Sequence, residues 1–397
     1  MRTPTFAVAV LLAVVAAPVV AQAPPSATAD LRGTVNGPGT GRIRVTVWHN
    51  DMGKHAIEPI AEGFADDAGR FAFDRVPWFV RQEWGHHSIV MVARRDGYAG
   101  LVTLRGDDAK VGAIAVTVAP TIALRGTVRG ADGKPLAGAR VWPAQFGANE
   151  KGMPRAWVTE PLLPWLAETA ADGSFTLRDL PPLAPFKLRA THPDHATAWV
   201  DAVDPAQPVA AQLEAGGRIR GGVRTPDGKP AVRVLVAAAA NGIGYANALT
   251  DDQGNFELTG LPPDTYKVWA EAPDLTVIAV TGIAVHGGQT SDAAIVQLTP
   301  GGFIVGRILD AETGKPFAPG PWTDVAMYGP ARGDGGACEC TPVLPDGTFR
   351  IRAPAGRNRI YLRAAGDGYS EPTERVTVED GKETIVEWKL TRGPRRR

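Results

Sequence analysis

The hydrophobic residues of this chain alternate with polar residues in short runs, which is the pattern of half-buried β-strands. The clearest run opens at Phe256 and follows an Asp-x-Gly turn, Asp252 to Gly254. Aspartate and glycine tolerate the backbone angles that a hairpin turn requires. The run ends at a Leu-Pro-Pro corner, residues 261–263, because proline offers no N–H group to a strand ladder. A second period-two run follows, so turn, strand, corner and strand form one predicted unit.

This unit occurs four times along the chain, and internal repetition therefore decides the architecture. Each strand after a corner carries an apolar triplet at period two, and all four triplets end in alanine, as a crowded core position requires. The turns run from Asp67 to Phe71, Asp172 to Phe175, Asp252 to Phe256 and Asp346 to Phe349. The triplets are Ile89/Met91/Ala93, Phe186/Leu188/Ala190, Tyr266/Val268/Ala270 and Ile360/Leu362/Ala364.

Each copy also begins with a strand of the form apolar-x-Gly-x-apolar. These strands contain Leu31/Gly33/Val35, Leu124/Gly126/Val128, Ile219/Gly221/Val223 and Ile304/Gly306/Ile308. Their spacing leaves enough residues for one small β-sandwich per copy, and helical periodicity is nearly absent. We predict an all-β protein of four tandem β-sandwich domains. The predicted domains cover residues 30–121, 122–215, 216–299 and 300–391, and the first is the most divergent.

The N-terminus has the pattern of a secretory signal peptide, which we assign to residues 1–23. Arg2 precedes an uninterrupted apolar segment from Phe6 to Val20, and small residues follow at Ala21 and Ala23. We expect cleavage after Ala21 rather than after Ala23, because Pro24 would follow the latter bond. No later run reaches the roughly 18 apolar residues that a spanning helix needs. The sequence therefore predicts an exported protein that is periplasmic, at the cell surface or secreted, with a basic tail at 392–397.

The composition agrees with many short strands and limits the possible partners. Glycine (46 residues) and proline (34 residues) are abundant, as expected for strands joined by turns. The chain carries 42 basic and 42 acidic residues, so its formal net charge is zero. This balance gives no electrostatic reason to expect a nucleic acid or an anionic membrane as the main partner.

The repeated residues resemble the carboxypeptidase regulatory-like domain, a transthyretin-like β-sandwich. The resemblance rests on the first strand, the Asp-x-Gly-x-Phe hairpin, the Leu-Pro-Pro corner and a Gly-Lys-Pro turn. That last turn occurs at 133–135, 228–230 and 314–316. Such domains accompany metallocarboxypeptidase catalytic domains and occur in tandem in bacterial exported proteins. The resemblance covers nearly the whole mature chain, most clearly the third copy, and implies non-catalytic modules with a fold close to one used for starch binding.

Several residues of the sequence could serve as metal ligands. His55 and Glu58 have the H-x-x-E spacing of a zinc site, and His192 offers a third ligand. The intervening residues read as β repeats and leave no room for an α/β catalytic domain. The His192 to His195 segment and the Asp66-Asp67 and Asp251-Asp252 pairs occupy turn positions, where such residues are expected without a metal. We therefore expect no catalytic, cofactor or metal site.

Cys338 and Cys340 are the chain's two cysteines and lie two residues apart. In an extended strand this spacing is at the outer limit of disulfide reach, so a local bridge would be strained. We expect an intermolecular link or a plain loop rather than redox chemistry.

Ten tryptophans exceed what four small cores need. Several lie in proline- or glycine-marked inserts, where a flat ring packs on a neighbouring domain or stacks on a sugar. The candidate ligand platform consists of Trp84, Trp157, Trp165 and Trp269.

These observations predict a non-catalytic exported rod of β-sandwiches that acts as an extracytoplasmic binding or scaffolding module. Specificity is expected in the non-repeated loops, His49 to Asp66 and Gln145 to Glu168, because loops carry function on a rigid scaffold. The expected partner is a cell-envelope polymer, a polysaccharide or a protein. A carbohydrate-binding protein that uses the loop tryptophans is the first alternative, and a zinc-dependent hydrolase is the second.

Overall fold

The computed structural model describes residues 27–38, 41–51, 56–78, 87–104, 113–148, 154–158, 160–240, 245–272, 274–293, 295–319, 323–329, 339–363 and 368–392. Within these ranges the chain is built of β-strands, and helical structure is limited to the 3-10 turn Leu163–Trp165. No helix in the described ranges is long and apolar enough to cross a membrane. The all-β fold predicted from the alternating pattern is confirmed.

The sheets pack face to face in pairs, and each pair encloses a hydrophobic core. We call each pair a sandwich. Sandwich 1 combines the sheet β4-β1-β7 with the sheet β3-β2-β5-β6-β8. Its strands are β1 (Ala27–Asn36), β2 (Arg44–Asp51), β3 (Ala56–Phe64), β4 (Arg70–Trp78), β5 (His87–Arg95), β6 (Tyr98–Leu104), β7 (Ile114–Thr117) and β8 (Ala119–Pro120).

Sandwich 2 combines the sheet β13-β9-β16 with the sheet β11-β10-β14-β15, to which β12 adds beside β10. Its elements are β9 (Ile122–Arg129), β10 (Arg140–Ala148), β11 (Pro154–Trp157), η2 (Leu163–Trp165), β12 (Ala167–Glu168), β13 (Ser174–Leu180), β14 (Phe186–His192), β15 (His195–Val203) and β16 (Val209–Gln212).

Sandwich 3 combines the sheet β20-β17-β25-β22, with β24 beside β17, and the sheet β19-β18-β21-β23. Its strands are β17 (Gly217–Arg224), β18 (Leu235–Ala239), β19 (Tyr245–Leu249), β20 (Asn255–Leu261), β21 (Asp264–Glu271), β22 (Thr276–Val277), β23 (Val280–Val285), β24 (Thr290–Asp292) and β25 (Val296–Thr299).

Sandwich 4 combines the sheet β29-β26-β32 with the sheet β28-β27-β30-β31. Its strands are β26 (Gly302–Asp310), β27 (Asp324–Tyr328), β28 (Glu339–Pro342), β29 (Thr348–Ala353), β30 (Gly356–Arg363), β31 (Thr373–Val378) and β32 (Glu383–Leu390). We propose that the four sandwiches are the four domains, with the boundaries predicted from the repeats.

The four sandwiches share one topology. In each, the first strand lies between the antiparallel strand that carries the turn phenylalanine and a parallel strand from the end of the repeat. That first strand contains the repeated glycine, and the glycine pairs in register with the phenylalanine. The pairs are Gly33–Phe71, Gly126–Phe175, Gly221–Phe256 and Gly306–Phe349. The sequence repeats therefore mark cross-strand partners.

The glycine of each repeated turn, in the form Asp-x-Gly or Asp-Gly, has a left-handed backbone. Gly69, Gly173, Gly254 and Gly347 have φ values of 76°, 75°, 73° and 77°. Their carbonyl groups accept bonds of 2.7–2.8 Å from the first strand, at Val35, Val128, Val223 and Ile308. Glycine adopts this conformation without steric cost, which explains why it recurs in all four turns.

Proline corners are tied to the strands that follow them. The Tyr266 hydroxyl donates to the Pro262 carbonyl at 2.9 Å, and Asn358 Nδ2 donates to the Pro354 carbonyl at the same distance. Both hydrogen bonds join residues four positions apart, so different side chains bond to the equivalent corner carbonyl in sandwiches 3 and 4. Burial raises the pKa of Tyr266, which keeps its hydroxyl in the donor form.

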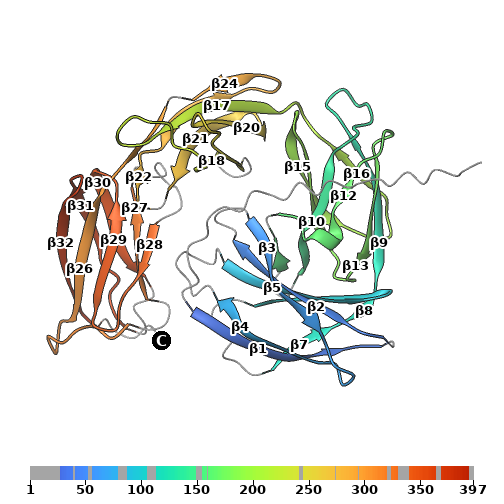
Figure 1. Ribbon diagram of the computed structural model, residues 1–397, viewed down its shortest axis with the longest axis horizontal. Coiled ribbons are helices and arrows are strands. Elements are labelled where there is room, and N and C mark those ends of the chain that lie inside the picture. Colours follow the sequence, from blue (N-terminus) through green and yellow to red (C-terminus); the bar gives the residue numbers. More distant parts are fainter. Residues whose placement is uncertain are drawn as a thin grey trace, which may run out of the picture.

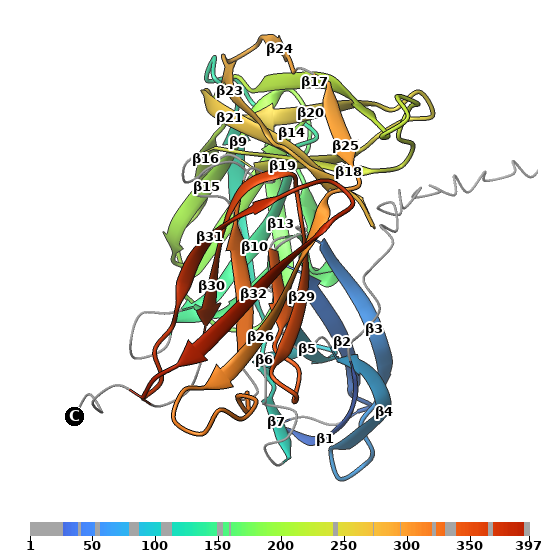
Figure 2. The same cartoon turned by 90° about the vertical axis from the view of Figure 1, so that its left-hand side faces the viewer.

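The sandwiches follow one another along an arc rather than a straight line (Figure 1). In the view turned by 90°, sandwich 4 stands in front and sandwich 3 lies above it (Figure 2). The rod expected from the sequence is therefore bent, because the junctions turn the chain between neighbouring sandwiches.

Candidate functional site

Trp165 and Trp269 are not surface platforms. Trp165 lies in the 3-10 turn and is 1% exposed, and its Nε1 donates to the Asp179 carbonyl at 2.8 Å. Trp269 is 5% exposed and meets Tyr245 edge-on, with 6.4 Å between ring centroids. The prediction that these rings face a ligand is wrong, because contacts from residues distant in sequence cover both of them.

Of the other two predicted platform residues, Trp157 is described by the structure and Trp84 is not. Trp157 ends β11 and is 43% exposed, so its ring stays a candidate for sugar stacking. Trp84 lies outside the described residues.

The two predicted specificity loops are largely ordered elements that join sandwiches 1 and 2. The first contains β3, which pairs with β2, and the second contains β11, η2 and β12. Trp48, Val90 and Val92 of sandwich 1 share one buried apolar cluster with Val158 and Leu162 of sandwich 2. These segments are therefore largely strands and a 3-10 turn rather than loops, and their role in specificity stays a prediction.

A buried polar contact accompanies this interface. Asn50 Nδ2 donates to Ser88 Oγ at 3.1 Å and to the Trp157 carbonyl at 3.0 Å. Asn50 is fully buried, so its amide is satisfied by partners from both sandwiches. The bond to Trp157 therefore links sandwich 1 directly to sandwich 2.

The zinc ligands considered from the sequence are not gathered in the described structure. Nδ1 of buried His49 lies 3.7 Å from Glu58 Oε1, whereas His55 lies outside the described residues. His192 belongs to the far end of sandwich 2, at the start of its junction with sandwich 3. Among the described residues, no group of three or more His, Cys, Asp or Glu side chains is placed to hold a metal ion.

The acidic pairs support turns. Asp251 Oδ1 accepts bonds from the backbone N–H groups of Gln253 and Asn255 at 2.9 and 2.8 Å. Asp66 Oδ1 does the same for Ala68 and Arg70 at 3.0 and 2.8 Å. Backbone donors lower the pKa of each carboxyl, the bond from Asn255 most for Asp251. The first aspartate of each pair is thus occupied as a turn acceptor.

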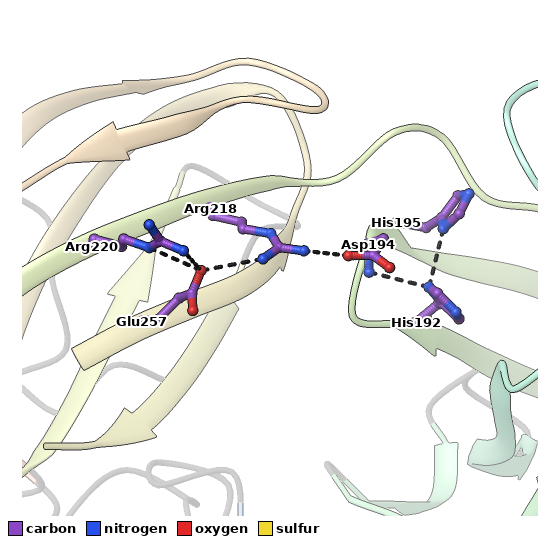
Figure 3. A network of polar contacts seen from close by, with 6 residues as sticks. All are labelled: His192, Asp194, His195, Arg218, Arg220 and Glu257. Atoms are coloured by element: carbon purple, nitrogen blue, oxygen red, sulfur yellow. Dashed lines mark hydrogen bonds and ion pairs between the residues drawn. The ribbon is translucent and has the colours of Figure 1, made fainter. Parts of the chain in front are cut away.

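A network of charged and imidazole groups spans the junction of sandwiches 2 and 3 (Figure 3). Arg218 pairs with Asp194 of sandwich 2 and, at 3.3 Å, with Glu257 of sandwich 3. Arg220 also reaches Glu257, at 3.0 Å. Arg218 therefore joins carboxylates from the two sandwiches, and residues distant in sequence order the junction.

Two histidines adjoin this network. His192 Nδ1 lies 3.2 Å from His195 Nδ1 and accepts a bond from the Asp194 N–H group at 3.1 Å. Burial lowers the pKa of His192, the neighbouring His195 lowers it further, and Asp194 opposes the shift. The segment is a turn between β14 and β15, as predicted, and it also holds the network at the junction.

An aromatic and cationic ladder covers the outer face of sandwich 2. Trp142, Arg189 and Trp199 are partners in register on three adjacent strands. The Arg189 guanidinium carbon lies 5.3 Å from the centroid of Trp142 and 5.6 Å from that of Trp199. Cation–π contacts of this kind stabilise a buried arginine such as Arg189. This ladder was not predicted from the sequence, although the Arg-x-Trp pattern of Arg140 and Trp142 in β10 is a local sign of it.

The outer face of sandwich 4 combines arginines with tyrosines. Arg357 and Arg359 of β30 and Arg375 of β31 are exposed, and Arg359 and Arg375 are partners in register. Tyr328 stacks on Tyr361 with 5.1 Å between centroids and 9° between ring planes. This surface was not predicted from the sequence, because it depends on which strands become neighbours.

Cys340 belongs to this sheet rather than to a loop. It lies in β28, and its Sγ accepts a bond from Arg363 Nη2 at 2.8 Å. The plain loop considered for Cys340 is therefore wrong, because the strand pairs with β27. Cys338 lies outside the described residues.

The fold defines an all-β protein of β-sandwiches. Its residues 218–299, which form most of sandwich 3, match the carboxypeptidase regulatory-like domain family, and this confirms the resemblance seen in the sequence. No curated protein matches the chain.

The chain is also similar in fold to several solved bacterial structures. A streptococcal ancillary pilin is 12% identical, with a TM-score of 0.26 and coverage of 69% of this chain and 100% of that one. The Bacillus anthracis TIE protein is 12% identical, with a TM-score of 0.22 and coverage of 93% and 69%. Two B repeat units of the Staphylococcus aureus collagen binding protein are 14% identical, with a TM-score of 0.19 and coverage of 92% and 99%. At these identities the similarity extends no further than the fold.

Proposed function

We propose that the chain is a non-catalytic exported protein that acts as a binding or scaffolding module outside the cytoplasm. The observation that carries this proposal is the buried interface between sandwiches 1 and 2. Val90 and Val92 point away from the core of their own sandwich and are nevertheless buried, at 0% and 2% exposure. An interface of this kind holds neighbouring sandwiches in one orientation, which suits a scaffold that presents surfaces at fixed positions.

The repeated residues support the same proposal. Glycine, phenylalanine and aspartate recur in all four copies and serve turns and cross-strand packing. A site built from the repeat would recur with it, so ligand specificity belongs to surfaces that differ between sandwiches. Several weak surfaces on one scaffold bind a polymer with high avidity. We infer a cell-envelope polymer, a polysaccharide or a protein as the partner.

The proposal is tested by capture on the immobilised mature chain. Fractions of the cell envelope, purified polysaccharides and envelope proteins are passed over it, and bound material is eluted with salt. We expect enrichment of one polymer, together with export of the chain when the cells are fractionated. Retention of no component, or a cytoplasmic location, would overturn the proposal.

A carbohydrate-binding protein is the second candidate, and the exposed ring of Trp157 favours it. This alternative predicts that Trp157→Ala abolishes retention on a glycan column while the thermal unfolding temperature stays close to that of the parent. Phe64→Ala is the matched control, because Phe64 is an exposed aromatic residue of similar exposure, 42%, in sandwich 1.

A further inference from the structure

We propose that the exposed part of the outer face of the sheet β28-β27-β30-β31, formed by β30, β31 and Tyr328 of β27, binds an acidic polysaccharide through arginine and tyrosine side chains. The inference rests on the proposed binding function and names its site and its ligand class. Its four strands are labelled in Figure 1, and β30 and β31 are labelled in Figure 2.

Strand alternation places the binding residues on one face. Asn358, Ile360 and Leu362 of β30 are buried in the sandwich. Arg357, Arg359 and Tyr361 alternate with them and therefore lie on the opposite face, because successive side chains of a strand point to opposite sides. On β31 the same alternation places Arg375 and Thr377 outside, since Val376 and Val378 are buried. Register adds Tyr328 beside Arg359, and Arg359 beside Arg375.

The charges on this face are not balanced. Asp324 belongs to the same face, but Arg363 holds its carboxylate with two bonds of 2.5 and 2.7 Å, and both residues are buried. No described carboxylate forms an ion pair with Arg357, Arg359 or Arg375. Arg350, on the other sheet of the sandwich, shows the usual arrangement, because it pairs with Glu383 at 3.1 Å.

The direct pairing of Arg359 with Arg375 is unfavourable for the fold. Like charges opposite each other on neighbouring strands destabilise a sheet, and nothing in the described core requires both to be basic. An anionic partner between the two guanidinium groups removes the repulsion. Arginine is suited to this role because its planar guanidinium forms two parallel bonds to one carboxylate.

The tyrosines indicate that the anion is carried on a sugar. Tyr328 and Tyr361 are stacked, and Tyr328 is 40% exposed, so a partly open aromatic surface adjoins the arginines. Such a surface accepts the apolar side of a sugar ring, and its hydroxyl group bonds to sugar hydroxyls. A nucleic acid or an anionic membrane requires a larger positive field than a chain of zero net charge provides. A uronic acid polymer matches both the carboxylate and the ring.

The test compares the mature chain with the double variant Arg359→Gln/Arg375→Gln. The probes are polygalacturonate, a neutral β-glucan, single-stranded DNA and vesicles containing phosphatidylglycerol. We expect polygalacturonate to bind, with an affinity that falls as salt rises, and the glucan to bind at least tenfold more weakly. The double variant should lose tenfold or more in affinity and show a weaker salt dependence. Tyr328→Ala should weaken binding without changing the salt dependence.

Arg350→Gln is the matched control, because Arg350 is an exposed arginine of the same sandwich whose charge is already paired. Its affinity should equal that of the parent. Equal binding by the parent and the double variant would overturn this site, while capture of a polymer by both would leave the proposed function intact. Tighter binding of DNA or vesicles than of polygalacturonate would overturn the ligand class. Capture of no polymer by the parent would count against the proposed function as well.

Discussion

At the scale of single residues, each repeat is defined by a glycine that makes room for a phenylalanine. A Cβ atom added to Gly221 would lie 2.6 Å from the Phe256 ring. A Cβ atom added to any of the other three repeated glycines would lie 2.0 to 2.8 Å from the ring of its paired phenylalanine. The aromatic ring thus covers the glycine of the neighbouring strand and shields its backbone, as in designed sheets where an aromatic residue compensates for a glycine. The conserved spacing within the repeats follows from this contact.

The variant Gly221→Ala tests the contact. The added methyl group forces the Phe256 ring or the strand to move, and overpacking of this kind costs about 1–3 kcal/mol of stability. Denaturant unfolding monitored by circular dichroism measures the loss. Gly222→Ala is the control, because its Cβ would meet only the flexible end of the Arg224 side chain at 3.3 Å. Equal stability of the two variants would contradict the role assigned to Gly221.

The turn aspartates make a pH-dependent contribution to stability. Backbone donors lower the pKa of Asp251 below its ordinary value of 3.8, so the unfolded chain takes up the proton first on acidification. The stabilisation is complete above that ordinary value and is lost as the pH falls through the lower value of the folded state. Asp251→Asn keeps an acceptor oxygen but no longer titrates. We expect unchanged stability at pH 7 and a shallower loss as the pH falls below the ordinary value of 3.8, measured by urea unfolding at each pH.

At the scale of elements, the strand β5 packs against a different apolar cluster on each of its two faces. The inner face of β5 carries Ile89 and Met91 into the core of sandwich 1, as the period-two pattern predicts. Its outer face carries Val90 and Val92 into the cluster of sandwich 2. A strand that is apolar on both faces is expected when both are covered. The continuous apolar run from Ile89 to Ala93 was therefore the signal for an interface.

Val92→Asp tests whether this interface holds the two sandwiches together. An unpaired carboxylate buried between them costs on the order of 3 kcal/mol, because no described partner offsets its desolvation. We expect faster proteolysis between sandwiches 1 and 2 and a lower unfolding temperature. Ala115→Asp is the control, since Ala115 is exposed on β7. The same protease sensitivity in both variants would show that the interface contributes nothing.

At the scale of the whole molecule, the arc depends on the junctions between sandwiches. The junction of sandwiches 2 and 3 rests on polar contacts, which contrast with the apolar interface between sandwiches 1 and 2. Arg218 is only partly exposed there, so its pairs with Asp194 and Glu257 are screened less than isolated surface pairs. Because ion pairs respond to salt and pH more than apolar contacts do, the geometry is more sensitive to both at this junction than at the interface of sandwiches 1 and 2.

Acidification should weaken this junction through His192. Its pKa is lowered, chiefly by burial and then by His195, so the folded state favours the neutral ring. The contribution is complete above the ordinary value of 6.5 and is lost as the pH falls through the lower folded value. Small-angle X-ray scattering at pH 7.5 and pH 5 should show a larger maximum dimension at the lower pH. His192→Asn, which does not titrate, should show a smaller change, and an identical change would contradict the assignment.

The sequence by itself determined the repeated sandwich, because turns, glycine–phenylalanine pairs and alternating strands are local patterns with one compatible fold. It also located Phe256, Gly254 and the inward triplets correctly, except for Ala364, which lies outside the described residues. Only the tertiary structure decided which outer faces are covered. Trp165 and Trp269 are buried by Asp179 and Tyr245, and Arg359 meets Arg375, through contacts that sequence distance does not reveal. Burial of an outer face depends on the neighbouring strand or sandwich, and no periodicity within one strand encodes that neighbour.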